Sequence, residues 1–244
     1  MVQAIIFGAV SGLSLLFGAA TGLIFKLNQK VIARFMAFGA GVLVCALTFG
    51  LMEEAFGHGG FDAIIIGFLL GGIVFILGDY VLHLKGGRRH KRHQLVEARK
   101  DSNGKVITMG ALLDGIPESV ALGIALFTGG GTGILMLVAI VLSNFPEGIS
   151  SVDGLKKEGF TSAGIYKIWG VVALLALIFT VLSFVFLHDI TPNTIGIIEA
   201  FAAGAILAML ADSMMPEAFD DGGFSIGILT VLGFLTAFIV SKLS

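Results

Sequence analysis

Two short motifs place a proline one residue before a glutamate inside an apolar stretch: DGIPES over 114–119 and SNFPEG over 143–148. A carboxylate at membrane depth is expensive and by default marks a pathway for ions or substrate. A proline inside a helix leaves the carbonyl four residues earlier without its donor, which here frees the carbonyls of Leu113 and Leu142. Carboxylates beside freed carbonyls would form an oxygen-rich site, and such a site suits a divalent cation.

Five polar residues of these motifs are the candidate metal ligands. Asp114 and Glu118 are four residues apart and therefore share one face of the first helix. On the second helix, Glu147 lies about one turn after Ser143 and Asn144. If the helices are antiparallel, Asp114 faces Glu147, and a second polar level about 6 Å away pairs Glu118 with Ser143. Carboxylates this close repel unless a cation or a shared proton lies between them. The alternative is two kinked packing helices whose carboxylates are protonated or hydrogen-bonded to Ser and Asn.

The composition is that of a polytopic membrane protein. Of 244 residues, 56% are hydrophobic and 13% are charged, and the mean hydropathy is +0.99, whereas about a quarter of the residues of a soluble domain are charged. Apolar stretches of about 20 residues predict an all-α transmembrane domain of eight helices that covers the whole chain, 1–244. The helices are expected near residues 3–25, 33–54, 61–84, 105–127, 133–155, 164–187, 194–217 and 224–243.

The basic residues predict the orientation in the membrane. Fourteen of the fifteen Lys and Arg residues lie in three loop regions on one side of an eight-helix bundle, and Lys242 lies opposite. By the positive-inside rule that side is cytoplasmic, so both termini are expected outside the cell membrane. The basic cytoplasmic loop 85–104 holds His90 and His93, which could bind a metal loosely, although a solvated loop near lipid head groups is the simpler interpretation. Basic residues confined to loops form no nucleic-acid surface, which excludes that partner.

An internal repeat relates the two halves of the chain. Residues 37–56 align without gaps to residues 200–219, with nine of twenty positions identical. The second and seventh predicted helices, which contain them, run in opposite directions, and the two Pro-Glu motifs form a second inverted pair. Helices 1–3 are therefore expected to correspond to helices 6–8 around a central pair, helices 4 and 5. Inverted repeats are typical of transporters, with the substrate site near the midplane.

Weaker polar positions toward the helix ends are candidate pathway residues. Glu54 closes the second predicted helix at its outer end, and His58 lies just beyond it. Glu217 is at the inner end of the seventh helix, with Asp212 about a turn deeper. Asp153 follows the SNFPEG motif and could mark an exit. Ordinary interfacial carboxylates would account for the same residues.

Together these features resemble the ZIP (Zrt/Irt-like) family of divalent metal transporters over the whole chain. That family's helix 4 motif is His-Asn-x-Pro-Glu-Gly, and its helix 5 motif is a polar pair, any residue, proline, and then Glu-Gly or His-Glu. SNFPEG matches the second motif, so Asn144 and Glu147 are on ligand positions, whereas DGIPES has Asp114 for the histidine and Gly115 for the asparagine. Glu217 resembles a family carboxylate at the inner exit. The resemblance also implies a homodimer.

The donor set leaves the metal open. The predicted site contains oxygen donors without histidine or thiol, which suit Mg, Mn and other hard cations, whereas imidazole and thiolate favour zinc. Zinc also accepts carboxylates, so Zn, Mn, Fe, Co and Cd all remain candidates. Gly115 in place of asparagine, and a sixth helix without a carboxylate, favour one metal ion over two.

The predicted function is a divalent metal cation transporter that moves metal toward the cytoplasm by alternating access. The sequence has no GxxxxGK[ST] motif, so direct use of a nucleotide is not expected. A cation or proton channel could use the same carboxylates, and saturable flux would separate the two. An intramembrane enzyme is disfavoured, because HExxH is absent and because an enzyme gives no reason for inverted repeats.

Overall fold

A computed structural model describes residues 1–84, 104–129 and 131–243 of the chain. Every regular element in these residues is a helix, which confirms the all-helical prediction for this part of the chain. The α-helices are α1 (Val2–Ile24), α2 (Gln29–Ala46), α3 (Glu53–Leu84), α4 (Gly104–Thr128), α5 (Thr132–Lys157), α6 (Ser162–Phe186), α7 (Pro192–Met209), α8 (Met215–Gly222) and α9 (Ile226–Leu243). Two π-helical segments, η1 (Leu47–Met52) and η4 (Leu210–Met214), continue α2 and α7.

Six helical runs in the described residues are long and apolar enough to cross a membrane, which makes this a multi-pass membrane protein. Four of them are the single helices α1, α4, α5 and α6. The other two, Gln29–Leu82 and Pro192–Leu243, have 54 and 52 residues. A straight helix of that length would measure about 80 Å, more than twice the ~30 Å of a bilayer's hydrocarbon core. Eight separate spans stay a prediction.

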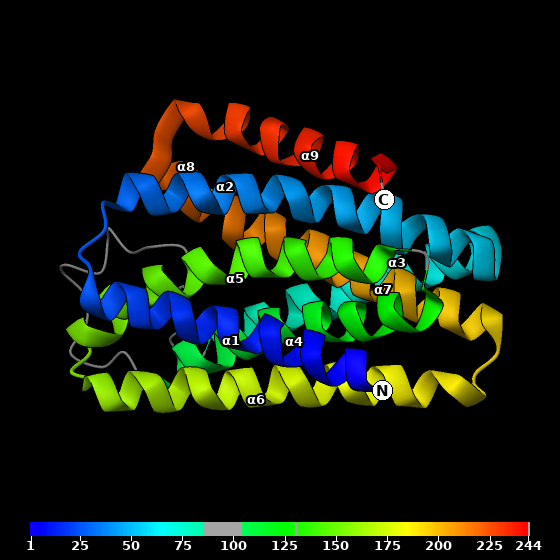
Figure 1. Cartoon of the computed structure of the whole chain (residues 1–244), viewed down its shortest axis with the longest axis horizontal. Coiled ribbons are helices and arrows are strands. Elements are labelled where there is room, and N and C mark those ends of the chain that lie inside the picture. The colour runs from blue at the N-terminus through cyan, green and yellow to red at the C-terminus, as the bar shows by residue number, and fades with distance from the viewer. Residues whose placement is uncertain (85–103, 130, 244) are drawn as a thin grey trace.

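Each long run breaks at a glycine with positive φ. Gly60 in α3 has φ 64° and ψ −159°, and Gly223 after α8 has φ 66° and ψ −148°. A residue with a Cβ is strained in this region, whereas glycine adopts it freely. After Gly223 the chain turns back, and α9 runs beside α2 (Figure 1).

The two long runs also share local backbone features at aligned positions. The alignment of residues 37–56 with 200–219 relates positions 163 residues apart. Leu47 and Leu210, which begin the π-helical segments, have this separation, and so do Gly60 and Gly223. The aligned sequences therefore adopt the same sequence of α-helix, π-helix and glycine turn.

The helices pack in two groups. The first group contains α1, α4, α5 and α6. The second joins two pairs, α2 with α9 and α3 with α7, which meet through the π-helical segments η1 and η4, and α2 against α5 is the main contact between the two groups. Glycines allow close approach in the second group: a Cβ on Gly41 of α2 would overlap the Thr230 carbonyl of α9, and one on Gly204 of α7 would overlap the Phe68 carbonyl of α3. Small residues at such contacts are typical of helices packed in lipid.

Both termini lie at one end of the bundle, and the α1–α2 and α5–α6 connections lie at the other (Figure 1). Lys26 is in the first connection, and Lys156 and Lys157 end α5 just before the second, so these described basic residues share one end as predicted. Most of the loop 85–104, with His90 and His93, lies outside the described residues. Which end faces the cytoplasm stays a prediction.

Candidate metal site

Both Pro-Glu motifs lie inside helices that continue through the proline. Pro117 is within α4 and Pro146 is within α5. Each proline leaves a carbonyl one turn earlier without its usual donor. The carbonyl of Leu142 lies beside Gly39 of α2, where a Cβ would come within 2.8 Å of its oxygen. This freed carbonyl is therefore at the contact between α5 and α2, and the glycine makes room for it.

The polar side chains of the motifs are mostly buried where α4 meets α5. Asp114 and Glu118 of α4 are 6% and 3% exposed, and Asn144 of α5 is 3% exposed. The Ser143 hydroxyl lies 3.4 Å from Oε1 of Glu118 and 2.9 Å from the Ile140 carbonyl oxygen, and it can donate to either. Ser143 and Glu118 are therefore neighbours, as predicted, whereas their role as metal ligands stays a prediction. Glu147 is half-buried, and its negative charge lies close enough to repel that of Glu118. Two repelling carboxylates beside hydroxyl and amide groups make a place where a cation would be stabilised.

Further hydrogen bonds fix the side chains around this place. The Asn144 amide nitrogen, Nδ2, donates a hydrogen bond to the Ser11 carbonyl of α1 at 3.4 Å. The amide oxygen, Oδ1, is then the atom of Asn144 that could bind a cation. Ser119 donates to the Gly115 carbonyl at 2.6 Å. In the part of the chain that the structure describes, no three His, Cys, Asp or Glu side chains gather closely enough to hold one metal ion. A cation here would therefore need oxygens of Ser143 or Asn144 besides the carboxylates.

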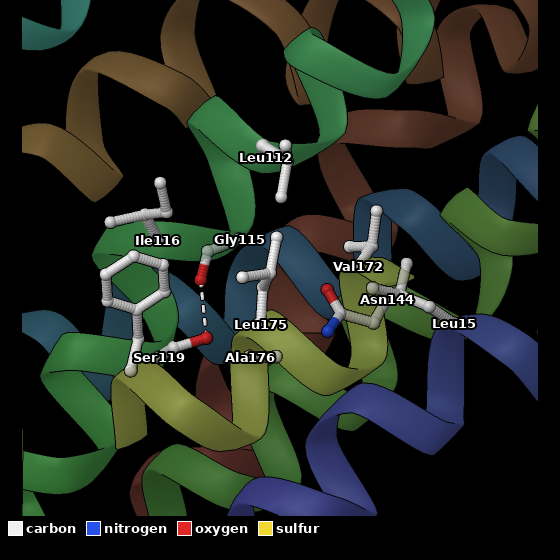
Figure 2. A pocket seen from close by; sticks show the side chains of 10 residues that line it. Leu15, Leu112, Gly115, Ile116, Ser119, Asn144, Val172, Leu175 and Ala176 are labelled. Atoms are coloured by element: carbon white, nitrogen blue, oxygen red, sulfur yellow. Dashed lines mark hydrogen bonds between the residues drawn. The ribbon is translucent and has the colours of Figure 1, made fainter. Parts of the chain in front are cut away.

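A small cavity of about 10 Å³ lies beside the two motifs, between α1, α4, α5 and α6. Figure 2 shows Ser119 and Asn144 among its apolar lining residues. Gly115 also lines it, and a Cβ there would meet no described atom within 4 Å. A cavity of this size holds about one water molecule, so a hydrated ion would have to shed water to enter. The remaining lining residues are apolar and include Leu15, Leu112, Val172 and Phe179.

Glu54 joins the two helix groups at the end of the bundle that carries the termini. Its carboxylate accepts hydrogen bonds from the Thr128 hydroxyl at 2.6 Å and the Thr132 hydroxyl at 2.5 Å. These threonines end α4 and begin α5, whereas Glu54 is in α3. A cleft of about 320 Å³ opens beside it and is also lined by Glu53 and Lys242. Acidic groups thus border an opening at this end.

His58 contacts a buried carboxylate that the sequence analysis missed, Glu199. Nδ1 of His58 lies 2.9 Å from Oε2 of Glu199 in α7, and Glu199 is 0% exposed. Glu199 is the one charged residue of α7. A single carboxylate in an otherwise apolar helix was the feature of the sequence that could have identified it as a candidate site residue. Its partner is 141 residues away in the sequence, which is why spacing could not reveal the pair.

The other predicted pathway residues lie nearer the opposite end or on other elements. The Asp153 carboxylate accepts a hydrogen bond from Nε2 of Gln29, the first residue of α2, at 3.0 Å in an exposed position. Asp212 is exposed in η4, and Glu217 is half-buried in α8. Helix α8 packs against α2. A path through these residues stays a prediction.

Comparison with known proteins gives one informative similarity. No known family model matches the sequence. Among curated proteins, one from Arabidopsis thaliana with the name "Putative zinc transporter" is 24% identical over 217 residues. The similarity covers 85% of this chain and 34% of that protein, so the chain spans about one third of its relative's length. Most of the chain is therefore similar to a part of a protein named for zinc transport.

Proposed function

We propose that this protein is a divalent metal cation transporter with its substrate site on α4 and α5. The observation that carries the proposal is the burial of Asp114 and Glu118 inside a membrane-crossing helix, with Ser143 and Asn144 opposite. Ionisable residues in this setting mark a pathway. The Arabidopsis relative supports metal transport and makes zinc the first substrate to test.

A divergent ZIP-like architecture explains the arrangement best. The glycine turns at Gly60 and Gly223 support dividing each long run into two spans, which makes eight spans in total. The matching π-helical segments and turns support inverted repeats of helices 1–3 and 6–8 around α4 and α5. With the basic connections in the cytoplasm, both termini are outside the cell membrane. A homodimer follows from the family resemblance alone.

The two helix groups suggest how access alternates. Helices α1, α4, α5 and α6 carry the site, and they move as a group against α2, α3, α7 and α9. In the conformation described, Glu54 ties α3 to the α4–α5 connection through Thr128 and Thr132, beside the cleft at the predicted outer end. A bound cation offsets the repulsion between Glu118 and Glu147, so the loaded site crosses the membrane more easily than the empty, charged one. Metal is then released toward the cytoplasm.

Competition among metals tests this function against a channel. Uptake of zinc into proteoliposomes is expected to saturate and to be reduced by Mn, Fe, Co or Cd when these share the site. A carrier binds its substrate in each cycle and therefore saturates. The measurement is the initial rate of zinc uptake at rising concentrations of each competitor, with protein-free vesicles as the control. Flux that rises linearly without competition would favour the channel.

Replacing Asp114 with histidine should shift the metal preference toward zinc. The substitution adds an imidazole to a site of oxygen donors, and imidazole suits zinc better than manganese. The expected change is a ratio of zinc to manganese uptake that rises by about tenfold, equivalent to about 1.4 kcal/mol of relative affinity. Asp114→Asn is the matched control, because it keeps an oxygen donor. A metal profile unchanged by the histidine would remove Asp114 from the ligands.

A further inference from the structure

A second group of metal-compatible side chains lies between α3 and α7, away from the Pro-Glu motifs. It consists of His58 on α3 and Glu199 on α7, 2.9 Å apart between Nδ1 and Oε2. His58 is in the first two turns of α3, and Glu199 is in the first half of α7. We propose that this pair is a second binding site for a divalent cation, of the class that accepts both imidazole and carboxylate.

The first argument is the incomplete bonding of a fully buried carboxylate. Glu199 is 0% exposed, and its Oε1 accepts no hydrogen bond from the described part of the chain. Leaving a buried charged oxygen without a partner is costly. A cation between the glutamate and the histidine would bond that oxygen and neutralise the charge.

The second argument is the supply of a further carboxylate. Glu54 is four residues before His58 in α3, so both side chains leave the helix on the same face. The negative charge of Glu54 is close enough to Glu199 to repel it. At present Glu54 accepts hydrogen bonds from Thr128 and Thr132. A cation beside His58 would relieve the repulsion. In this conformation the three side chains are not gathered around one point, so Glu54 would have to leave Thr128 and Thr132 to become a third ligand.

The local backbone keeps the pair accessible and close. His58 is 32% exposed, so an ion can reach its ring from outside the bundle. Gly196 of α7 lies against α3, where a Cβ would come within 2.7 Å of the Ala55 carbonyl oxygen. This close approach brings the two helices together beside the pair.

The ligand chemistry differs from that of the site on α4 and α5. A histidine with one or two carboxylates, completed by water, is a donor set that zinc prefers. The two helices that supply His58 and Glu199 belong to the same helix group. A cation held by His58 and Glu199 would stay in place while the other group moves, so this is a resident site, and it shares only Glu54 with the proposed outer contact to α4 and α5.

Zinc binding in a protein without the central carboxylates tests the proposal. The double variant Glu118→Ala, Glu147→Ala is purified in detergent, and bound zinc per chain is measured by equilibrium dialysis. We expect this variant to retain a zinc site whose affinity falls at least about tenfold when His58→Gln is added, since loss of groups that support a metal typically costs 10–100-fold in affinity. Glu199→Gln should have the same effect.

The controls separate this site from other histidines. His188→Gln removes an exposed histidine from the end of α6 and should leave the zinc affinity unchanged. Size-exclusion elution of each variant as a single peak shows that it is folded, and His58→Gln carries the test alone if Glu199→Gln misfolds. Zinc binding that is unaffected by His58→Gln would overturn the proposal. So would a double variant that binds no zinc, because the pair would then share only a proton.

Discussion

Replacing Glu118 or Glu147 with alanine is expected to reduce metal uptake into proteoliposomes to the level of protein-free vesicles. Each change removes one of the two carboxylates whose charges repel across α4 and α5. In the loaded site each carboxylate would pair with the cation, and removing one partner of a buried pair of opposite charges costs about 3–5 kcal/mol, where every 1.4 kcal/mol is about tenfold in an equilibrium constant. The affinity for the cation should therefore fall by roughly 100-fold or more. The measurement is the initial rate of zinc uptake at equal protein content.

Two control variants show whether the effect belongs to the site. Ser143→Ala removes a neutral hydroxyl 3.4 Å from Glu118, so its loss of uptake should be smaller than that of either glutamate variant. Asp220→Ala removes an exposed carboxylate on α8 and should leave uptake within about twofold, as expected for a surface substitution. Normal transport by both glutamate variants, with normal insertion, would remove the two residues from the pathway.

The variant Gly148→Ala should lose both thermal stability and uptake. Gly148 follows Glu147 in α5, and a Cβ there would overlap the carbonyl oxygen of Leu15 and come within 3.1 Å of the Gly18 Cα, both in α1. Overpacking costs about 1–3 kcal/mol when side chains can adjust, and here the obstacle is backbone. A loss of about 3 kcal/mol lowers the melting temperature of a protein of this size by roughly 6–12 °C. Uptake falls as well because α5 carries Glu147.

Gly154→Ala is the matched control, since it makes the same change in the same helix. A Cβ on Gly154 meets no described atom within 4 Å. Alanine also favours helix over glycine by about 1 kcal/mol, so this variant should melt at or slightly above the temperature of the wild type. The comparison is made by thermal unfolding in detergent. Equal melting temperatures for the two variants would contradict the close packing of α1 on α5.

The helical elements could be predicted well because apolar length alone decides them in a membrane. The helix expected over 164–187 is α6, Ser162–Phe186, and the one expected over 133–155 is α5, Thr132–Lys157. The π-helical segments and the turns at Gly60 and Gly223 could not be predicted from hydropathy. Gly57, Gly59 and Gly60 are all close together, and only the backbone shows that the third of them makes the turn.

Part of the candidate site could also be predicted from the sequence, and part could not. Antiparallel register was sufficient to pair Glu118 with Ser143, since four residues make about one turn on each helix. Glu199 was missed because it has no polar neighbour at helical spacing, and its partner His58 comes from the other half of the chain. The freed Leu142 carbonyl lies beside α2 because of the way that α2 packs on α5. The spacing of residues in the sequence does not indicate which helices pack together.

The most direct test of a metal carrier with its site on α4 and α5 is one side-by-side measurement. The initial rate of zinc uptake is followed as a function of zinc concentration, in vesicles that contain equal amounts of wild-type protein or of Glu118→Ala. We predict a saturating curve for the wild type and a rate at the protein-free background for the variant. Saturating uptake of the same size in both would contradict the assignment, and so would uptake by the wild type no faster than by empty vesicles.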